Sequence, residues 1–494
     1  MKKIAFLTSY IATPHLETEL ELMQLHIDSG DKVYQVVCDG NLSVCLGNAE
    51  NVKQTCLECI SKRNKGTNLI SGRVNKINIF NQPEKYDLSF LPNEFISIEA
   101  LKEYRIDNFD AGMSVVSSLV SYAKTPYLNI KDNQDYIKRS LEAATYTYFA
   151  TRDFLKENKF DMFYIFNGRF SIEKAALRAC EFHNQVFSTH ERGCDKGHYE
   201  VFENVLPHNI SYNHSKMLEY WEKETDLAKR RQEAVTFFES KRDNVWKSWT
   251  PFLNSQKNAE LPANWDKTKY NIVVFTTSDN EFVAIGDEWK QFVFDSQLEG
   301  IQEIAETLRS IGNKSIQLYV RLHPNLSNYE PEHEFTINAL AQFSDVLHVV
   351  DAYSSNSSYA ILLNCDKVIT FGSTMGMEAT YFEKPSISLS SSFYQYLDVV
   401  YQPNNKEEAM NLILDMALIP KSKEKALIGS FYLQTFGVKY NYYKPITLFS
   451  GKFCGLNLLE TRSKAFLLFH SFKQEIKKII NKIIGREKFE IYEV

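Results

Sequence analysis

One stretch does most to decide the fold of this chain: Phe371-Gly-Ser-Thr-Met-Gly-Met-Glu-Ala-Thr-Tyr-Phe-Glu-Lys-Pro-Ser-Ile387. It follows a short β-branched run, so it predicts a strand end, a tight turn, a helix start and then a second strand. Gly372 and Gly376 allow close approach of the backbone, while Ser373 and Thr374 place hydroxyl groups at the start of the helix. Because the first N–H groups of a helix lack partners, this turn is predicted to bind an anion.

A second segment supports the same interpretation. Leu318-Tyr-Val-Arg-Leu-His-Pro324 ends another predicted strand with a cation, an imidazole and a rigid turn. In the first segment, Glu378 lies on the first turn of the helix, within reach of a ribose if a phosphate sits at Ser373. Together the two segments predict a nucleotide-sugar site.

The bulk properties limit the function classes. The 494 residues exceed what one hydrophobic core supports, so we expect two domains. The net charge of −6 argues against a general nucleic-acid binder, which would usually be basic. No apolar run approaches the roughly 20 residues that cross a bilayer. The signal-like start at residues 1–7 is too short and continues into Thr8, so it predicts a first core strand in a cytoplasmic protein.

The order of predicted elements indicates an α/β fold. Residues 3–38 predict a strand, a helix and a strand, which is a βαβ opening and implies a parallel sheet. Residues 160–192 predict further strand–helix steps, residues 214–250 predict one or two long helices, and a second wound unit begins at Tyr270. We therefore expect two Rossmann-like doubly wound domains.

These patterns give approximate domain limits. An N-terminal domain is expected over residues 1–260 and a C-terminal domain over residues 268–450, followed by a helical tail over residues 455–494. Within the tail, residues 462–488 carry Phe and Ile at helical spacing, with eight Lys or Arg against two Glu. Such a basic amphipathic helix suits an anionic membrane surface, and packing on the body of the protein is an equal alternative.

The motifs resemble those of a known group of proteins. Arg321-Leu-His-Pro324, Phe371-Gly-Ser-Thr-Met-Gly-Met-Glu-Ala379 and the loop Thr277–Trp289 resemble segments of bacterial capsule and surface-polysaccharide biosynthesis proteins. That group includes the Kdo-transferases of capsule assembly and bacterial sialyl- and polysialyltransferases, and its architecture is GT-B. The resemblance is specific over roughly residues 270–400.

The resemblance implies transfer of a sugar from a nucleotide donor to a growing surface glycan. It places the donor phosphate at His323, Ser373 and Thr374, with Arg321 offsetting charge and Glu378 holding the ribose. The complete set of expected donor-site residues is Thr277, Ser278, Arg321, His323, Pro324, Gly372, Ser373, Thr374, Gly376 and Glu378. The alternative is that these residues merely cap a strand and a helix.

An inverting transfer also needs a base for the acceptor hydroxyl, and the N-terminal domain is expected to hold it. Glu191, in His190-Glu-Arg-Gly193, resembles the acidic-acidic-Gly motif of bacterial sialyltransferases, although Arg192 replaces the second acidic residue. His15, in the first strand–helix loop, is the other candidate, and His323 is also counted among the catalytic candidates. Structural ion pairing of Glu191 and a helix-start role for His15 are the alternatives; a retaining transfer needs neither base.

Four cysteines lie close together in the sequence: Cys38, Cys45, Cys56 and Cys59. Four thiolates can close a tetrahedral zinc site, and the turn-forming residues between them predict an irregular excursion over residues 38–59 that a metal would hold. An iron–sulfur cluster or four free cysteines are the alternatives. No cofactor is expected for the chemistry itself.

The expected partners follow from this interpretation. They are a CMP-, UDP- or CDP-linked donor, a glycan or lipid-linked glycan acceptor and an anionic membrane surface at the tail, with no nucleic acid. Two rival functions share the architecture. A nucleotide-sugar 2-epimerase would release UDP without an acceptor, and a non-catalytic GT-B-like protein would act as a scaffold of the assembly complex.

Overall fold

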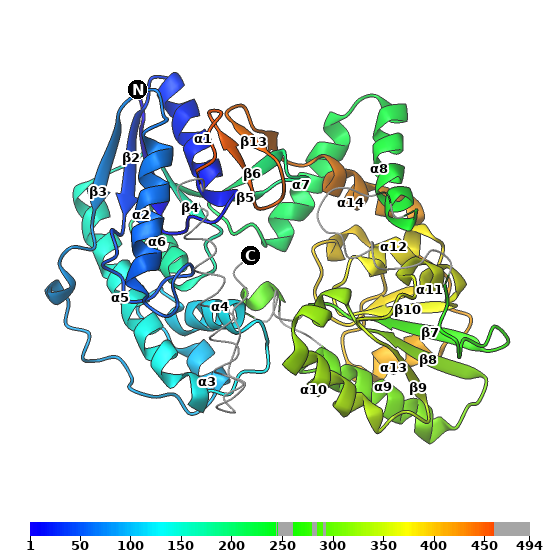
Figure 1. The fold of residues 1–494 in the computed structure, drawn as a ribbon. Coiled ribbons are helices and arrows are strands. Elements are labelled where there is room, and N and C mark those ends of the chain that lie inside the picture. The colour runs from blue at the N-terminus through cyan, green and yellow to red at the C-terminus, as the bar shows by residue number, and fades with distance from the viewer. Residues whose placement is uncertain (244, 246–259, 279–283, 290–292, 459–494) are drawn as a thin grey trace, which may run out of the picture.

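The computed structural model describes residues 1–243, 245, 260–278, 284–289 and 293–458. It has two α/β bodies, each built on a mainly parallel sheet, with helices covering the sheets (Figure 1). The predicted α/β fold with two Rossmann-like units is confirmed. Most of the tail expected over residues 455–494, including its basic segment, lies outside the described residues.

The N-terminal sheet has seven strands in the order β12-β6-β5-β4-β1-β2-β3. The strands from β5 to β3 are parallel to one another. β6 pairs antiparallel with β5, and β12 pairs antiparallel with β6. Its strands are β1 (Lys3–Thr8), β2 (Lys32–Val37), β3 (Val74–Asn78), β4 (Met162–Phe166), β5 (Phe187–Arg192), β6 (His198–Glu203) and β12 (Val438–Lys439). Five of the six residues of β1 are buried, as expected for a central parallel strand covered on both faces.

The helices of this body alternate with its strands or lie between them in the chain. They are α1 (His15–Asp28), α2 (Lys53–Thr67), α3 (Ile98–Glu103), α4 (Ala111–Ala123), α5 (Gln134–Glu157) and α6 (Ser171–Phe182). α1 and α6 begin directly after β1 and β4, where the sequence predicts helices. The residues between 38 and 59 are less irregular than expected, because Cys56 and Cys59 lie on α2.

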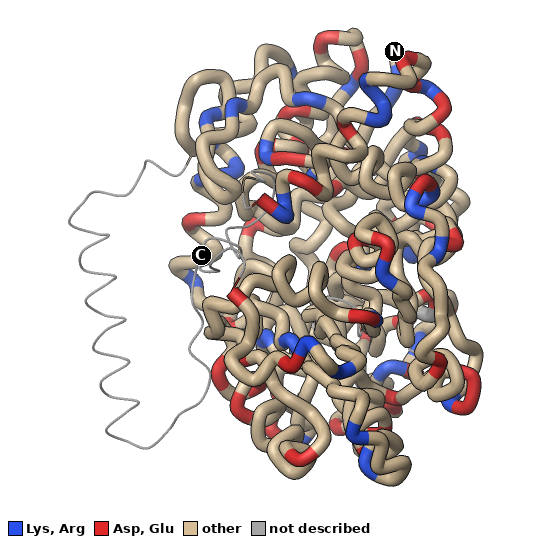
Figure 2. Tube along the Cα trace, turned by 90° about the vertical axis from the view of Figure 1, so that its right-hand side faces the viewer, with Lys and Arg blue, Asp and Glu red and all other residues tan. Residues whose placement is uncertain are grey.

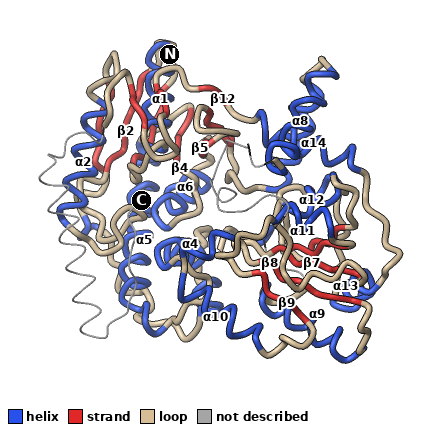
Figure 3. Tube along the Cα trace, turned by 45° about the vertical axis from the view of Figure 1, so that its right-hand side comes forward, coloured by secondary structure: helices blue, strands red, loops and turns tan. Residues whose placement is uncertain are grey.

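The C-terminal sheet has five parallel strands in the order β11-β10-β7-β8-β9. The strands are β7 (Tyr270–Phe275), β8 (Ile316–Arg321), β9 (Leu347–Val350), β10 (Lys367–Thr370) and β11 (Ser386–Ser388). The helices of this body are α9 (Gln297–Ile311), α10 (Glu330–Ala341), α11 (Ser358–Asn364), α12 (Met375–Tyr381) and α13 (Lys406–Leu414). The strand–helix alternation along the described part of this body matches the sequence prediction (Figure 3).

Three helices connect the bodies: α7 (Ile210–Lys223), α8 (Leu227–Arg242) and α14 (Lys423–Thr435). Their apolar side chains form one core cluster with Met377 of α12 and Tyr394, so α7 and α8 pack on the C-terminal body. The sequence prediction placed this helical segment in the N-terminal domain over residues 1–260. Sequence order alone does not indicate which body a connecting helix covers.

The chain then returns to the N-terminal body. β12 pairs with β6, and the hairpin of β13 (Tyr443–Pro445) and β14 (Gly451–Phe453) lies beside α1 (Figure 1). Glu21 of α1 accepts the backbone N–H groups of Asn441, Tyr442 and Tyr443 at 2.7 to 3.0 Å. Residues 438–458 therefore belong with the first sheet, although the C-terminal domain was expected to extend to residue 450.

The charged side chains of the two bodies are mixed. Lys and Arg alternate with Asp and Glu over the tube in Figure 2, in keeping with the net charge of −6. Within the described ranges, no helix is both long and apolar enough to cross a membrane.

Candidate active site

The first part of the site lies at the carboxyl edge of the N-terminal sheet. His15 begins α1 just after β1, and Glu191 lies near the end of β5. The Nδ1 atom of His15 is 3.5 Å from Oε1 of Glu191. The ring of Phe166 packs against the imidazole, with 4.2 Å between ring centroids. The two candidates for the base are thus neighbours and form one pair.

The electrostatics of this pair set the two protonation states. Burial lowers the pKa of His15 to about 3, although the carboxylate of Glu191 acts in the opposite direction. Burial would raise the pKa of Glu191, but His15, a hydrogen bond from Asn167 at 2.8 Å and the N–H of Arg192 hold it below its usual range. At neutral pH the pair is therefore a neutral imidazole beside a carboxylate.

Two further acids are buried at this edge, and the sequence analysis did not identify them. Glu173 near the start of α6 is fully buried and accepts a 2.5 Å hydrogen bond from Ser9. Glu19 accepts a bond of the same length from Thr8 and lies 3.5 Å from His190. Burial raises the pKa of Glu173 to about 7. The sequence does place both Glu residues near the start of a helix that follows a central strand, where a buried acid could have been expected.

The second part lies at the carboxyl edge of the C-terminal sheet, around His323. The backbone N–H of Asn325 donates to Nδ1 of His323 at 3.2 Å, and Ser278 lies 3.4 Å from the same nitrogen. Burial, with the charges of Arg321 and Lys241, lowers the pKa of His323 to about 4. Since Nδ1 accepts the backbone bond, the neutral ring carries its proton on Nε2, which is then a hydrogen-bond donor. Thr277, the other predicted loop residue, bonds through its N–H to Gln297 at 2.8 Å.

The turn after β10 has the backbone shape that its glycines predict. Gly372 has φ of +87°, and a Cβ there would lie 2.4 Å from the carbonyl oxygen of Ser391. A Cβ at Gly376 would lie 2.5 Å from the hydroxyl of Tyr394. The hydroxyl of Tyr394 donates to the carbonyl of Ser373. Ser391 and Tyr394 of the same body thus pack against the turn, and only glycine fits at these two positions.

Two predicted donor-site residues have internal partners instead. Arg321 is buried and donates to the carbonyls of Asp351 and Ser354, so its guanidinium holds the loop between β9 and α11. Glu378 is fully buried and accepts from Tyr359, Thr374 and Lys241. A carboxylate with these three donors has no exposed face for a ribose. The motif predicts where these side chains lie, but their partners come from other segments.

The zinc site at the four clustered cysteines stays a prediction, because their thiols do not converge on one point as they are arranged. Within the described ranges, the one group of three His, Cys or carboxylate ligands whose atoms lie within 4.8 Å of one another is Cys194, Asp195 and His198. The thiols of residues 38, 45, 56 and 59 do not form such a group. A tetrahedral site needs deprotonated thiolates converging on one point.

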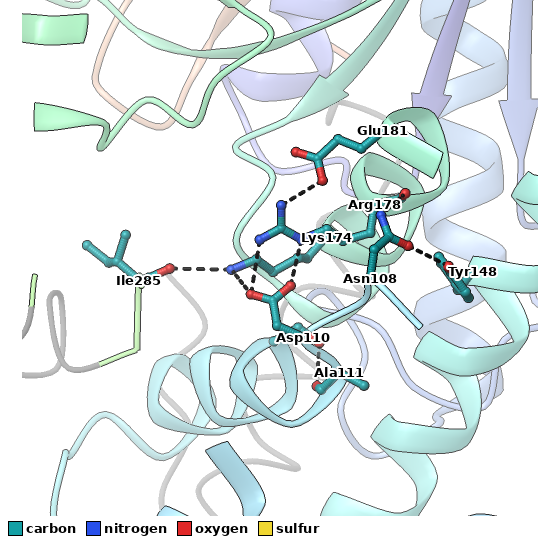
Figure 4. Close-up of polar contacts among 9 residues, drawn as sticks. Asn108, Asp110, Ala111, Tyr148, Lys174, Arg178, Glu181 and Ile285 are labelled. Carbon is teal, nitrogen blue, oxygen red and sulfur yellow. Dashed lines mark hydrogen bonds and ion pairs between the residues drawn. The ribbon is translucent and has the colours of Figure 1, made fainter. Parts of the chain in front are cut away.

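The two carboxyl edges face each other, as contacts between the bodies show. Lys174 of α6 donates to the carbonyl of Ile285, in the connection that follows β7, at 3.3 Å (Figure 4). Figure 4 also shows Asp110 holding Lys174 and Arg178 in one buried ion-pair network. In the same connection, Nε1 of Trp289 donates to the carbonyl of His208 at 2.8 Å. The connection that follows β7 therefore contacts the start of α6, after β4, and the loop before α7.

Comparison with known proteins agrees with the motifs. Residues 255–443 match the family described as capsule polysaccharide biosynthesis protein. This segment includes His323, Ser373 and the whole C-terminal sheet. The resemblance that the motifs carry is confirmed over these residues. No curated protein matches the chain at a significant level.

Solved structures with a similar arrangement are distant. A β-Kdo 2,4-transferase, KpsC from Thermosulfurimonas dismutans, is 13% identical with a TM-score of 0.36, covering 55% of this chain and 79% of that one. The β-Kdo 2,7-transferase of the same KpsC is 14% identical with a TM-score of 0.32, covering 58% and 90%. A putative UDP-N-acetylglucosamine 2-epimerase from Listeria monocytogenes is 10% identical with a TM-score of 0.26, covering 89% and 92%.

Proposed function

We propose that this chain is a nucleotide-sugar-dependent glycosyltransferase of capsule polysaccharide biosynthesis, since residues 255–443 match that family. The donor is a CMP-, UDP- or CDP-linked sugar bound on the C-terminal body. The acceptor is a capsule glycan or a lipid-linked glycan that enters over the N-terminal sheet. The observation that carries the proposal is the neutral His15 paired with Glu191 at an edge that faces this segment.

The pair supports a base-assisted transfer. The Nε2 atom of His15 accepts the proton of the acceptor hydroxyl as its oxygen bonds to the anomeric carbon of the donor. Glu191 holds the Nδ1 side of the ring and stabilises the imidazolium that forms. This role suits inversion, since the base and the leaving nucleotide lie on opposite sides of the sugar.

The C-terminal body supports departure of the nucleotide. The bond from the anomeric carbon to the phosphate oxygen breaks, and the leaving phosphate gains negative charge. Nε2–H of His323 and the hydroxyl of Ser373 are donors near this position, and fixed donors lower the barrier to charge formation. No metal ion is needed for this scheme.

The proposal is tested by nucleotide release with and without acceptor. The full chain is incubated with CMP-, UDP- and CDP-linked sugars, alone and with capsule oligosaccharide acceptors. We expect rapid release of one nucleotide only when an acceptor is present, and its loss in His15→Ala. A matched control is His26→Ala, a histidine of the same helix that pairs with Asp31. Release of UDP without an acceptor would favour the 2-epimerase, and no turnover with any donor would favour the scaffold.

The C-terminal tail is the subject of a separate proposal. Its sequence over residues 462–488 is basic and amphipathic, which suits an anionic membrane surface. We expect removal of residues 462–494 to shift the protein from membrane to soluble fractions of lysed cells. An unchanged distribution would exclude the tail as the anchor.

A further inference from the structure

The hairpin of β13 and β14 has two faces of opposite character. Tyr443 and Phe453 lie opposite each other in its register, and both are buried in the core cluster that includes side chains of α1. Because side chains alternate along a strand, the next pair, Lys444 and Lys452, points away from the body and is exposed. One face thus holds the hairpin on the N-terminal body, and the other presents two ammonium groups.

The two lysines lie directly opposite each other without a neutralising partner. Like charges at opposed positions of an antiparallel pair destabilise the pairing of its strands. Among the described residues, no carboxylate pairs with Lys444 or Lys452. Residues 436–459 include three Lys and no Asp or Glu. The hairpin therefore carries a like-charge pair that an anionic partner would stabilise.

The tip of the hairpin is apolar, exposed and held in one shape. Ile446 and Phe449 keep 54% and 48% of their surface exposed. The carbonyl of Ser450 accepts the N–H groups of Ile446 and Thr447 at 2.8 and 3.0 Å. The N–H of Phe449 donates to the hydroxyl of Thr447 at 3.2 Å. These bonds present the two apolar side chains from a fixed turn.

Further cations come from the end of β5 and the turn that follows it. Nζ of Lys196 donates to the carbonyl of Ile446 at 3.0 Å, and the guanidinium carbon of Arg192 lies 5.2 Å from the ring centroid of Phe449. The acids that lie near the hairpin already have partners within the protein; they are Glu21, Asp28 and Asp195. The apolar tip therefore lies beside positive charge from two separate segments.

A lipid surface fits both properties of the hairpin. Apolar side chains flanked by Lys and Arg are typical of segments that lie in the interface of an anionic bilayer. A glycan or a free phosphate would bind the cations but would leave Ile446 and Phe449 in water. The chain continues from this hairpin toward residues 462–488, whose eight Lys or Arg and two Glu suit the same surface.

We infer that the hairpin of β13 and β14 docks on an anionic phospholipid bilayer. Lys444 and Lys452 lie at the phosphate groups of the lipids, and the apolar tip enters the interface. This inference goes beyond the proposed transfer and does not depend on it, because the charge and the exposure of the hairpin belong to the folded chain alone. It is also separate from the proposal on the tail, since it concerns residues 443–453.

The contact brings the acceptor edge close to the bilayer. Pro14, which precedes His15, lines a small pocket together with Thr447 and Leu448 of the hairpin tip. If the proposed transfer holds, a lipid-linked acceptor approaches the base from the membrane side.

The first test measures binding of the full chain to vesicles. Vesicles of phosphatidylcholine mixed with phosphatidylglycerol are compared with phosphatidylcholine alone, by sedimentation at low salt. In Lys444→Gln with Lys452→Gln we expect the affinity for the anionic vesicles to fall by about 10- to 30-fold, because two charges near the lipid surface are lost. The matched control is Lys159→Gln with Lys314→Gln, two exposed lysines that precede β4 and β8, and it should bind like wild type.

The second test reports on the tip itself. Phe449→Trp places a fluorophore at the tip, and Phe90→Trp places one at a residue of similar exposure, 54%, away from the hairpin. With vesicles whose acyl chains are brominated, we expect Phe449→Trp to show more quenching than wild type. Phe90→Trp should show no added quenching.

The outcomes separate this inference from unfolding and from the other proposals. The lysine double variant should melt at or above the temperature of wild type, because it removes two opposed like charges. Equal affinity of wild type and the double variant for anionic vesicles would overturn the inference, as would no binding of wild type or no added quenching in Phe449→Trp. None of these results would change the expectation for nucleotide release, which tests the proposed transfer by itself.

Discussion

The two carboxyl edges of this molecule have similar parallel sheets but opposite chemistry. At the N-terminal edge, Glu191 pairs with a neutral His15, while Glu19 and Glu173 are buried on α1 and α6, so this edge holds and accepts protons. At the C-terminal edge, a neutral His323 lies beside Ser278, and the glycine turn after β10 carries further hydroxyl groups, so this edge suits a negative charge. The difference separates the two demands of a glycosyl transfer. In the transfer that we propose, one sheet activates the acceptor, and the other stabilises the leaving nucleotide.

The sharpest test removes the base from the N-terminal edge. In His15→Ala we expect kcat to fall by about 10²- to 10⁴-fold, the usual contribution of a general base, with little change in donor affinity. Steady-state kinetics with a saturating donor measures this. A similar loss of donor affinity would place His15 with the donor and would remove the contrast between the edges.

A second test concerns the proton that the N-terminal edge holds. Burial raises the pKa of Glu173 to about 7 from 4.5. A raised pKa means that the folded state binds the proton more tightly, so the stability from this group is present below pH 4.5 and is lost as pH rises through 7. In Glu173→Gln we expect the free energy of unfolding, relative to wild type, to increase by about 2.5 kcal/mol between pH 5 and pH 8.

Denaturant titrations at the two pH values measure the effect of Glu173→Gln. The exposed Glu222 of α7 provides the control, and Glu222→Gln should show no such pH dependence. If the stability of Glu173→Gln relative to wild type were the same at both pH values, Glu173 would be ionised throughout and this edge would hold no such proton.

A third test removes the neutral donor from the C-terminal edge. In His323→Ala we expect nucleotide affinity to fall by about 10- to 100-fold, because a hydrogen bond to a charged phosphate is lost. His348→Ala, on β9 of the same sheet, is the control and should bind nucleotide like wild type. Thermal-shift measurements with CMP, CDP, UDP, GDP and ADP report the binding of both variants, since a ligand of the folded state raises the melting temperature.

The smallest expected effect lies where the two edges meet. Trp289→Phe keeps an aromatic ring but removes the N–H that donates to the carbonyl of His208. We expect a loss of about 1 kcal/mol in the free energy of unfolding. Trp265→Phe is the control, because Nε1 of Trp265 has no hydrogen-bond partner in the described part of the chain. Equal losses in both variants would mean that ring packing, not this bond, joins the bodies.

The sequence predicted the local elements well, because strand and helix periodicity are properties of short segments. The strand at residues 3–8 and the helix that follows it are found with nearly the expected limits. The proximity of His15 to Glu191 also follows from the sequence, since the carboxyl ends of parallel strands meet at one edge.

The partners of buried polar residues could not be predicted in this way. Glu378 lies in the motif, but its acceptor capacity is taken by Tyr359, 19 residues earlier, and by Lys241, 137 residues earlier. Likewise, Arg321 bonds to the loop after β9. Such contacts depend on how helices pack, and the sequence pattern of one helix does not specify its neighbour.

The return of the chain to the first sheet has a consequence for folding. Val438 of β12 pairs with Tyr199 of β6, so this edge is completed only after the whole C-terminal body has been synthesised. At a synthesis rate of about 5–20 residues per second, the edge of β6 stays unpaired for roughly 10 to 50 seconds. During that interval, Glu21 also lacks the three N–H groups of residues 441–443 that it later accepts. The unpaired edge of β6 therefore exposes the nascent chain to aggregation from the synthesis of β6 until that of β12.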